Sequence, residues 1–288
     1  MLLITWALSL PLVTTITELI DRLEDCYDAI PGVGGARVEP VGPFELFLRD
    51  GPGWPYYARP RLGTTTVTAA DVEAVLARQR TLGVPPAIEW VHDVTPALLA
   101  AVESIGIAVL QAPLMVLDPA RLPATASLTD AQVTFLDPDL PDFPDSLAQS
   151  SAVAQVGFGA GGTGIGPAGT AERDAAVATK EPGLVALIAE GLRAGHKAEA
   201  VAFTPAEGVV ARGAFQSALG AAEIVGVATL PAVRRRGLGA AVSAALARHA
   251  LAHGNDLVFL SAASEDVARV YARIGFDRVG TACIAEAS

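Results

Sequence analysis

The stretch that decides the fold of this 288-residue chain is AEIVGVATLPAVRRRGLG, residues 222–239. Its first half is rich in Val and Ala and predicts a strand, which Pro231 ends because proline has no amide to donate to a sheet. Gly237 and Gly239 then open an apolar segment with helical spacing, and glycine lets the backbone turn tightly beside a ligand. The sequence therefore predicts a strand, a glycine turn and a helix start, where unpaired amides bind an anion.

Three consecutive arginines, Arg234, Arg235 and Arg236, stand at this helix start. The whole chain carries a formal charge of −11, yet residues 221–288 hold seven arginines and six acidic residues, a net charge of +1. Positive charge beside unpaired helix amides suits a diphosphate. The acidic total excludes general nucleic-acid binding, which depends on a basic surface.

The stretch resembles motif A of the GCN5-related N-acetyltransferases (the GNAT superfamily), whose pattern Arg/Gln-x-x-Gly-x-Gly/Ala reads Arg234, Gly237 and Gly239 here. The resemblance implies that acetyl-CoA is the acyl donor and that backbone amides hold its diphosphate. The residues that would form this cradle are Arg234, Arg235, Arg236, Gly237, Leu238, Gly239 and Ala240.

A second element of the family, Tyr-x-x-x-Gly-Phe, reads Tyr271, Gly275 and Phe276, in the family's order and with a predicted strand between the two motifs. The resemblance covers about residues 130–288. It implies an α/β (α+β) fold with a mixed, mostly antiparallel central sheet flanked by helices. It also implies that Tyr271 is the general acid that protonates the departing thiolate.

Other residues take their expected roles from the same resemblance. Glu223 is similar to the carboxylate that deprotonates the acceptor amine in histone-acetylating members, although a glutamate at a strand end is also often a plain salt-bridged residue. The backbone of Val227, Ala228 and Thr229 would hydrogen-bond the pantetheine arm as an added strand does. Ser264 stands where the family often has Asn, and serine can still cap the next helix.

The implied activity is transfer of an acetyl or another short acyl group to an amine by direct attack. An alternative is a CoA-binding or CoA-sensing module without turnover. The acceptor is open between a protein lysine and a small amine such as a polyamine, since an acidic N-terminal half would attract either. No His, Cys or Asp spacing indicates a metal site, and none is expected.

The length favours two domains, with the polar, proline-containing stretch 118–130 as linker. We expect an N-terminal α/β domain over 1–125 and a GNAT acetyltransferase domain over 126–288. Stretches 87–116 and 257–286 both run strand, helix, Ile-Gly, strand, so the first half is either a degenerate GNAT-like copy or an unrelated unit of the same order. No glycine motif precedes the first stretch, and Val102 stands opposite Tyr271.

The remaining periodicity predicts alternating helices and strands. Helices are expected over 17–29, 68–81, 96–104, 145–156, 170–178, 237–252 and 264–274. Strands are expected over 44–49, 87–91, 107–116, 133–136, 184–189, 198–203, 208–215, 222–230, 257–261 and 276–284.

Two glycine- or aromatic-rich loops invite other interpretations. Gly157–Gly162 matches GxGxxG, but a helical segment precedes it, whereas a dinucleotide site needs a strand. We expect it to join the first two helices of the acetyltransferase fold. The loop 54–60, WPYYARP, and the pair Glu89-Trp90 either line a pocket between the halves or pack there.

Composition indicates whether the chain is folded, which compartment suits it and whether it meets a membrane. Hydrophobic residues make up 51% of the chain and charged residues 18%, which excludes a disordered protein. Two cysteines without a CxxC motif favour a reducing cytoplasm. The apolar run Met1–Val13 lacks a basic start and is too short for a bilayer span, so we expect it to pack on the body, with no membrane partner.

Overall fold

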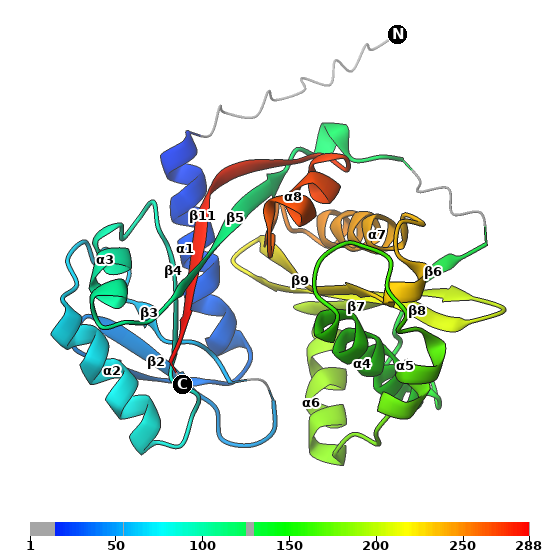
Figure 1. The fold of residues 1–288 in the computed structure, drawn as a ribbon, viewed down its shortest axis with the longest axis horizontal. Helices are drawn as coiled ribbons and strands as arrows, with labels where there is room; N and C mark the ends of the chain where they lie inside the picture. Colours follow the sequence, from blue (N-terminus) through cyan, green and yellow to red (C-terminus); the bar gives the residue numbers. More distant parts are fainter. Residues whose placement is uncertain (1–14, 54, 125–129, 288) are drawn as a thin grey trace, which may run out of the picture.

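The computed structural model describes residues 15–53, 55–124 and 130–287 (Figure 1). The expected packing of Met1–Val13 lies outside these residues, as does Trp54. The expected domain boundary, between residues 125 and 126, also lies outside them.

One eight-stranded sheet runs through both halves of the chain. All neighbouring strands are antiparallel except β9 and β10, which are parallel. The expected mixed, mostly antiparallel sheet is therefore confirmed. In spatial order the strands are β4 (Ala87–Val91), β11 (Phe276–Glu286), β5 (Val109–Leu117), β10 (Leu257–Ser261), β9 (Ala221–Thr229), β8 (Gly208–Ala218), β7 (Lys197–Thr204) and β6 (Gln132–Phe135).

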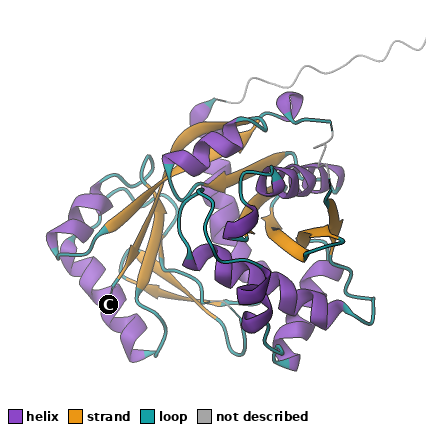
Figure 2. Cartoon of the chain, turned by 45° about the vertical axis from the view of Figure 1, so that its right-hand side comes forward, coloured by secondary structure: helices purple, strands orange, loops and turns teal. Residues whose placement is uncertain are grey.

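Helices cover both faces of this sheet (Figure 2). The helices are α1 (Ile16–Val33), α2 (Ala69–Thr81), α3 (Ala97–Ser104), α4 (Phe143–Gly159), α5 (Thr170–Ala176), α6 (Pro182–Arg193), α7 (Leu238–Ala252) and α8 (Glu265–Ala272). A second, three-stranded sheet comprises β1 (Arg37–Val41), β2 (Phe44–Leu48) and β3 (Arg59–Pro60). In Figure 1, α7 lies on one side of β7–β9 and α4 with α5 on the other.

The core between α7 and the sheet follows from the helix's apolar stripe. Leu238, Val242 and Leu246 are fully buried against the strands. Gly213 in β8 makes the close approach feasible, because a Cβ there would lie 3.0 Å from the side chains of Val242 and Leu246. The helix that begins at the glycine turn is therefore fixed firmly on the sheet, and its N-terminus with it.

The same order of elements occurs twice along the chain. The series β3-α2-β4-α3-β5 in the first half matches β9-α7-β10-α8-β11 in the second. Even the parallel pairing of β9 with β10 has a counterpart, a single parallel bridge between Ala58 and Ile88. The halves also exchange strands, since β11 lies between β4 and β5, and β5 lies between β11 and β10. The sheet is therefore continuous across the expected boundary.

One expected strand is wrong. Residues 184–189 lie in helix α6 (Pro182–Arg193), not in a strand. Val185, Ile188 and Leu192 recur at helical spacing and pack against Phe143 and its neighbours in α4. A short apolar run is also typical of a buried strand. Here proline at the first helical position favours a helix, and the apolar side of that helix packs against α4.

Glu89 and Trp90 of β4 both pack within the first half of the structure. Trp90 in β4 is 1% exposed and packs in a core with Phe44, Leu98 and Cys283. Glu89 forms an ion pair with Arg59 of β3 at 3.0 Å. For these two positions the expectation of packing is met, and the pocket described below lies elsewhere.

Candidate active site

Strands β9 and β10 separate along their length and leave a pocket between them. Their parallel pairing covers only three positions and ends at Phe259 opposite Glu223. Beyond that point β9 continues to Thr229, while β10 pairs with β5 on its other side. A cavity of about 760 Å³ fills the gap, lined by β9 residues 223–229 and by Ser261 of β10. The edge of β9 that faces this cavity therefore lacks a partner strand.

A β-bulge shapes that edge. Gly226 and Val227 together stand opposite the single residue Gly213 of β8, and the register shifts there. Gly226 has φ +62°, a left-handed conformation that glycine adopts without a steric penalty. Arg212 donates a hydrogen bond to the Gly226 carbonyl at 2.9 Å, and its guanidinium pairs with buried Glu199 at 2.7 Å. The Arg212 side chain, held by its ion pair with Glu199, thus anchors the bulge through the Gly226 carbonyl.

The turn before α7 exposes its backbone to the cavity. Arg235 has φ +69° and Gly237 has φ +78°, so the chain is left-handed on both sides of Arg236. Gly237 is the N-cap residue, no side chain caps the helix, and its first turn holds no acidic residue. The first residues of α7, Leu238 to Ala240, line the cavity. Unpaired amides and the positive end of the helix dipole therefore point to an anion.

The equivalent helix of the first half is closed to an anion. Thr68 accepts a hydrogen bond from the Asp71 amide at 3.3 Å, and the Asp71 carboxylate accepts one from the Thr68 amide at 2.9 Å. This capping box satisfies the first amides of α2 and adds a negative charge. The two helix starts therefore differ, because side chains cap α2 and none caps α7.

The three arginines of the turn have three different environments. Arg234 donates hydrogen bonds to the carbonyls of Gly157 and Gly161, at 2.7 and 2.8 Å, and so ties the turn to the glycine-rich loop. Arg236 points away from the cavity and pairs with Asp130 at 2.6 Å and Glu207 at 2.9 Å. Arg235 is exposed and lines the cavity. Of the three side chains, Arg235 is the one that is both exposed and on the cavity.

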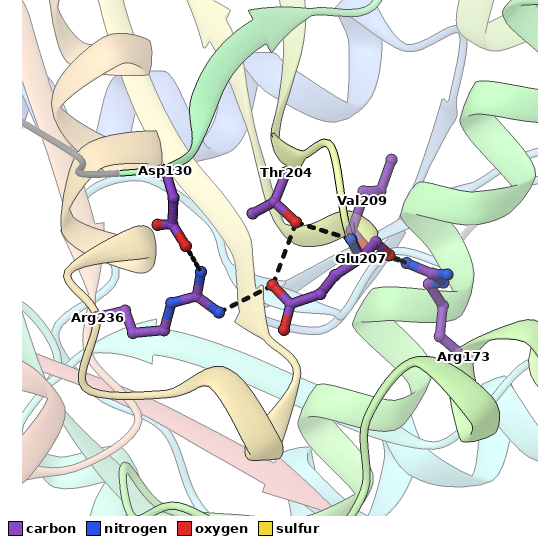
Figure 3. Close-up of polar contacts among 6 residues, drawn as sticks. All are labelled: Asp130, Arg173, Thr204, Glu207, Val209 and Arg236. Atoms are coloured by element: carbon purple, nitrogen blue, oxygen red, sulfur yellow. Dashed lines mark hydrogen bonds and ion pairs between the residues drawn. The ribbon is translucent and has the colours of Figure 1, made fainter.

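Figure 3 shows how Arg236 is held. Glu207 lies in the turn between β7 and β8, where the Thr204 hydroxyl donates to its carboxylate at 3.2 Å and accepts from its amide at 3.0 Å. Arg173 of α5, itself buried, donates to the carbonyls of Glu207 and Val209 at 2.6 Å. The Arg236 side chain therefore forms ion pairs that anchor the turn, and the expected contact of its backbone amide with a diphosphate stays a prediction.

Glu223 lies at the closed end of the cavity, where β9 and β10 part. It is 7% exposed, and Gln216 of β8 donates a hydrogen bond to its carboxylate at 2.9 Å. Burial raises the pKa of this carboxyl to about 7, and the hydrogen bond from Gln216 opposes the rise. Such a group can take up a proton near neutral pH, as a general base must.

Tyr271 lines the cavity from α8. The ring is 8% exposed and packs edge-on against Phe276, with ring centroids 5.9 Å apart. Burial raises the pKa of the hydroxyl to about 12, against the effect of a hydrogen bond with Ser243 of α7. The hydroxyl therefore stays protonated at neutral pH and can serve as a proton donor.

The cavity brings together most of the residues expected from sequence. Two expected residues do not line it, namely Arg236 and Ser264. Ser264 instead caps α8 by accepting a hydrogen bond from the Val267 amide at 3.4 Å. The expected residues that line the cavity are Glu223, Val227, Ala228, Thr229, Arg234, Arg235, Gly237, Leu238, Gly239, Ala240 and Tyr271.

The mouth of the cavity includes residues that the sequence analysis did not assign. Phe158 lines it from the last turn of α4, and Gly161, Gly162 and Thr163 line it from the loop between α4 and α5. Gly157 is still helical, and a Cβ there would lie 3.0 Å from that of Ala228. The GxGxxG match therefore serves close helix–sheet packing and a loop between two helices, as expected, and not a dinucleotide turn.

Several other groups bear on the chemistry. Cys26 and Cys283 are both buried and neither lines the cavity. Over residues 15–53, 55–124 and 130–287, no three His, Cys, Asp or Glu side chains come together as a metal site would require. None of the helices described in these ranges is long and apolar enough to cross a membrane.

Comparison with known proteins agrees with this geometry. Residues 206–284 match a family model described as FR47-like protein. A GCN5-related N-acetyltransferase from Kribbella flavida is similar over 94% of this chain and 96% of its own, with 19% identity and a TM-score of 0.67. A tandem GNAT protein from the clavulanic acid biosynthesis pathway is similar over 90% and 88%, with 15% identity and a TM-score of 0.52. No curated protein matches.

These likenesses, at identities below 20%, concern the fold. The chain has the fold of the GCN5-related N-acetyltransferases. Its last four strands and two helices, β8 to β11 with α7 and α8, lie in or overlap the FR47-like part.

Proposed function

We propose that this protein is an N-acyltransferase that moves an acetyl or another short acyl group from CoA to an amine. One observation carries the proposal. A single cavity joins the uncapped start of α7 to a buried carboxyl with a pKa of about 7, Glu223, and to a buried, protonated hydroxyl, Tyr271. An anion site, a base and an acid are the three parts that acyl transfer from a CoA thioester needs.

The donor fits the cavity in two places. The amides of Gly237 to Ala240 would hold the diphosphate, and the guanidinium of Arg235 would add a charge-assisted contact. The unpaired edge of β9, from Val227 to Thr229, would hydrogen-bond the extended pantetheine arm in place of a neighbouring strand. A capped helix or a straight, fully paired β9 would offer neither contact.

The reaction follows from the two titratable groups. The carboxylate of Glu223 takes a proton from the acceptor ammonium, because only the free amine is a nucleophile. The amine nitrogen then bonds to the thioester carbon, and the carbon–sulfur bond breaks. Tyr271 gives its proton to the departing sulfur, and the second proton that the nitrogen loses as the amide forms restores the Tyr271 hydroxyl. No cysteine lines the cavity among the described residues, so attack by the amine on the thioester is direct.

The alternative is a CoA-binding module without turnover, and a two-stage experiment separates the two. Calorimetric titration with acetyl-CoA comes first, followed by thiol release with a panel of amines that includes polyamines and lysine peptides. Binding with amine-dependent thiol release supports the enzyme. Binding with no thiol release above the rate of Glu223→Gln supports the module, and no binding refutes both.

A further inference from the structure

Helix α1 of the first half packs directly behind Glu223. Its buried face, including Leu23 and Cys26, lies against β9 and β10, and the Cys26 thiol donates to the Ala221 carbonyl at 3.5 Å. Tyr27 meets Phe259 edge-on, with ring centroids 5.2 Å apart. Phe259 is the residue that pairs with Glu223 where the two strands part. One helix of the first half therefore forms a wall behind the strands that carry Glu223.

A buried ion-pair cluster lies behind that wall. The guanidinium of Arg59, 3% exposed, stacks on the Tyr27 ring at 4.4 Å from its centroid. It pairs with Glu24 at 2.7 Å and with Glu89 at 3.0 Å. Tyr27 is thus fixed between Arg59 and Phe259. Since a buried guanidinium with two carboxylates holds a rigid geometry, the phenol has little freedom to move.

Some groups of this wall raise the pKa of the Glu223 carboxyl and others lower it. Burial is the largest cause of its raised pKa, and the carboxylate of Glu89 raises the pKa further. A hydrogen bond from Tyr27 and the charge of Arg59 lower it. On the sheet side Gln216 also lowers it.

The remaining titratable group on the wall is Cys26. Burial, and then the charge of Glu223, raise the pKa of its thiol to about 12. The thiol is therefore neutral over the pH range of interest and adds no charge beside Glu223.

We propose that Tyr27, Arg59 and Glu89 are positioning residues of the acyl-transfer site, through which the first half of the chain orients the Glu223 carboxylate. The proposal rests on the proposed function, in which Glu223 is the base. It assigns the first half a part in the chemistry, although its own helix start is closed to an anion.

Two conservative variants test the proposal, because they are expected to shift the pKa of the Glu223 carboxyl in opposite directions. Tyr27→Phe removes a hydrogen bond to the carboxylate, so the acid limb of the kcat/KM profile moves up by about one pH unit. Glu89→Gln removes a negative charge and frees Arg59 from one partner, so the limb moves to lower pH. Tyr57→Phe is the matched control, since the Tyr57 hydroxyl donates to Glu286 at 2.8 Å and not to Glu223.

A second readout does not need turnover. The Glu223 carboxyl carbon is followed by 13C NMR during a pH titration, with the signal assigned by its loss in Glu223→Gln. Opposite shifts in the two variants, with Tyr57→Phe unchanged, support the proposal. Unchanged titration in both variants overturns it, even where thermal stability falls. Opposite shifts in the two variants, together with a wild-type protein that shows no acyl transfer, would refute the proposed function alone.

Discussion

Arg212 donates a hydrogen bond to the carbonyl of Gly226 at 2.9 Å, in the part of β9 that borders the cavity. Because the guanidinium also pairs with buried Glu199, the bulge in β9 cannot relax without breaking a buried ion pair. Beyond the bulge, β9 pairs again with β8, through Ala228 and Thr229. The bulge is therefore part of the site and not a local irregularity.

Replacement of Gly226 by alanine tests that dependence. A Cβ at this position would overlap the Arg212 guanidinium, and φ +62° strains any L-residue. We expect Gly226→Ala to lower kcat by about tenfold or more, because misplaced groups slow an oriented reaction. Gly220→Ala is the control, since Gly220 also has a positive φ but lies in the β8–β9 turn outside the cavity. Equal kcat in the two variants would contradict this view of the bulge.

A carboxylate in the cradle should prevent donor binding. Gly237→Asp places a negative charge at the uncapped start of α7, where a diphosphate would lie. We expect acetyl-CoA affinity to fall by about a hundredfold or more in calorimetric titration. Gly254→Asp introduces the same strain beyond the other end of α7, at φ +89°, and should bind normally. Micromolar binding by Gly237→Asp would rule out the cradle.

Arg235 and Arg236 should differ in their contribution to acetyl-CoA affinity. Arg235→Ala removes the side chain at the cavity, and we expect acetyl-CoA to bind about tenfold more weakly, with melting temperature unchanged. Arg236→Ala breaks two partly exposed ion pairs and should have the smaller effect on affinity. Salt titration provides the check, since the charge contact of Arg235 is screened. A larger loss of affinity in Arg236→Ala would reverse the assignment.

Tyr271 is best tested by removal of its hydroxyl alone. Tyr271→Phe keeps the ring packed on Phe276 and removes the proton donor. We expect kcat to fall by about a hundredfold, as loss of a general acid does, with acetyl-CoA affinity nearly unchanged. Single-turnover thiol release measures the chemical step directly. A normal rate would leave Tyr271 as a packing residue.

Glu223 makes activity depend on pH near neutrality. A base must be ionised to accept a proton, and the pKa of this carboxyl is raised to about 7, chiefly by burial. We therefore expect kcat/KM to rise with pH through about 7 and to level off above it. In Glu223→Gln this limb should disappear together with most of the activity. A flat profile between pH 6 and 8 in the wild type would exclude Glu223 as the base.

Local features of the sequence predicted the centre of the site well. The strand, turn and helix of residues 222–239 follow from β-branched residues, a proline stop and glycine, each of which acts over a few positions. Gly226 carried a signal that was not used, since a glycine inside a strand pattern often marks a bulge.

Other features depend on residues far apart in the chain. The direction of Arg236 is set by Asp130 and Glu207, and no local pattern predicts that pairing. The anchor of Arg212 on Glu199 is equally non-local. The helix at 184–189 was mistaken for a strand because its apolar run is short and its partner face lies on α4. Tertiary contacts decided each of these cases.

The insertion of β11 between β4 and β5 has a consequence for synthesis on the ribosome. Until residues 276–286 emerge, β4 has one isolated parallel bridge for a neighbour, and β5 lacks its partner on one side. The first half then exposes two open strand edges, which are templates for aggregation. Completion of the earlier half must therefore wait for the later one, and the nascent chain should need shielding until its final strand is released.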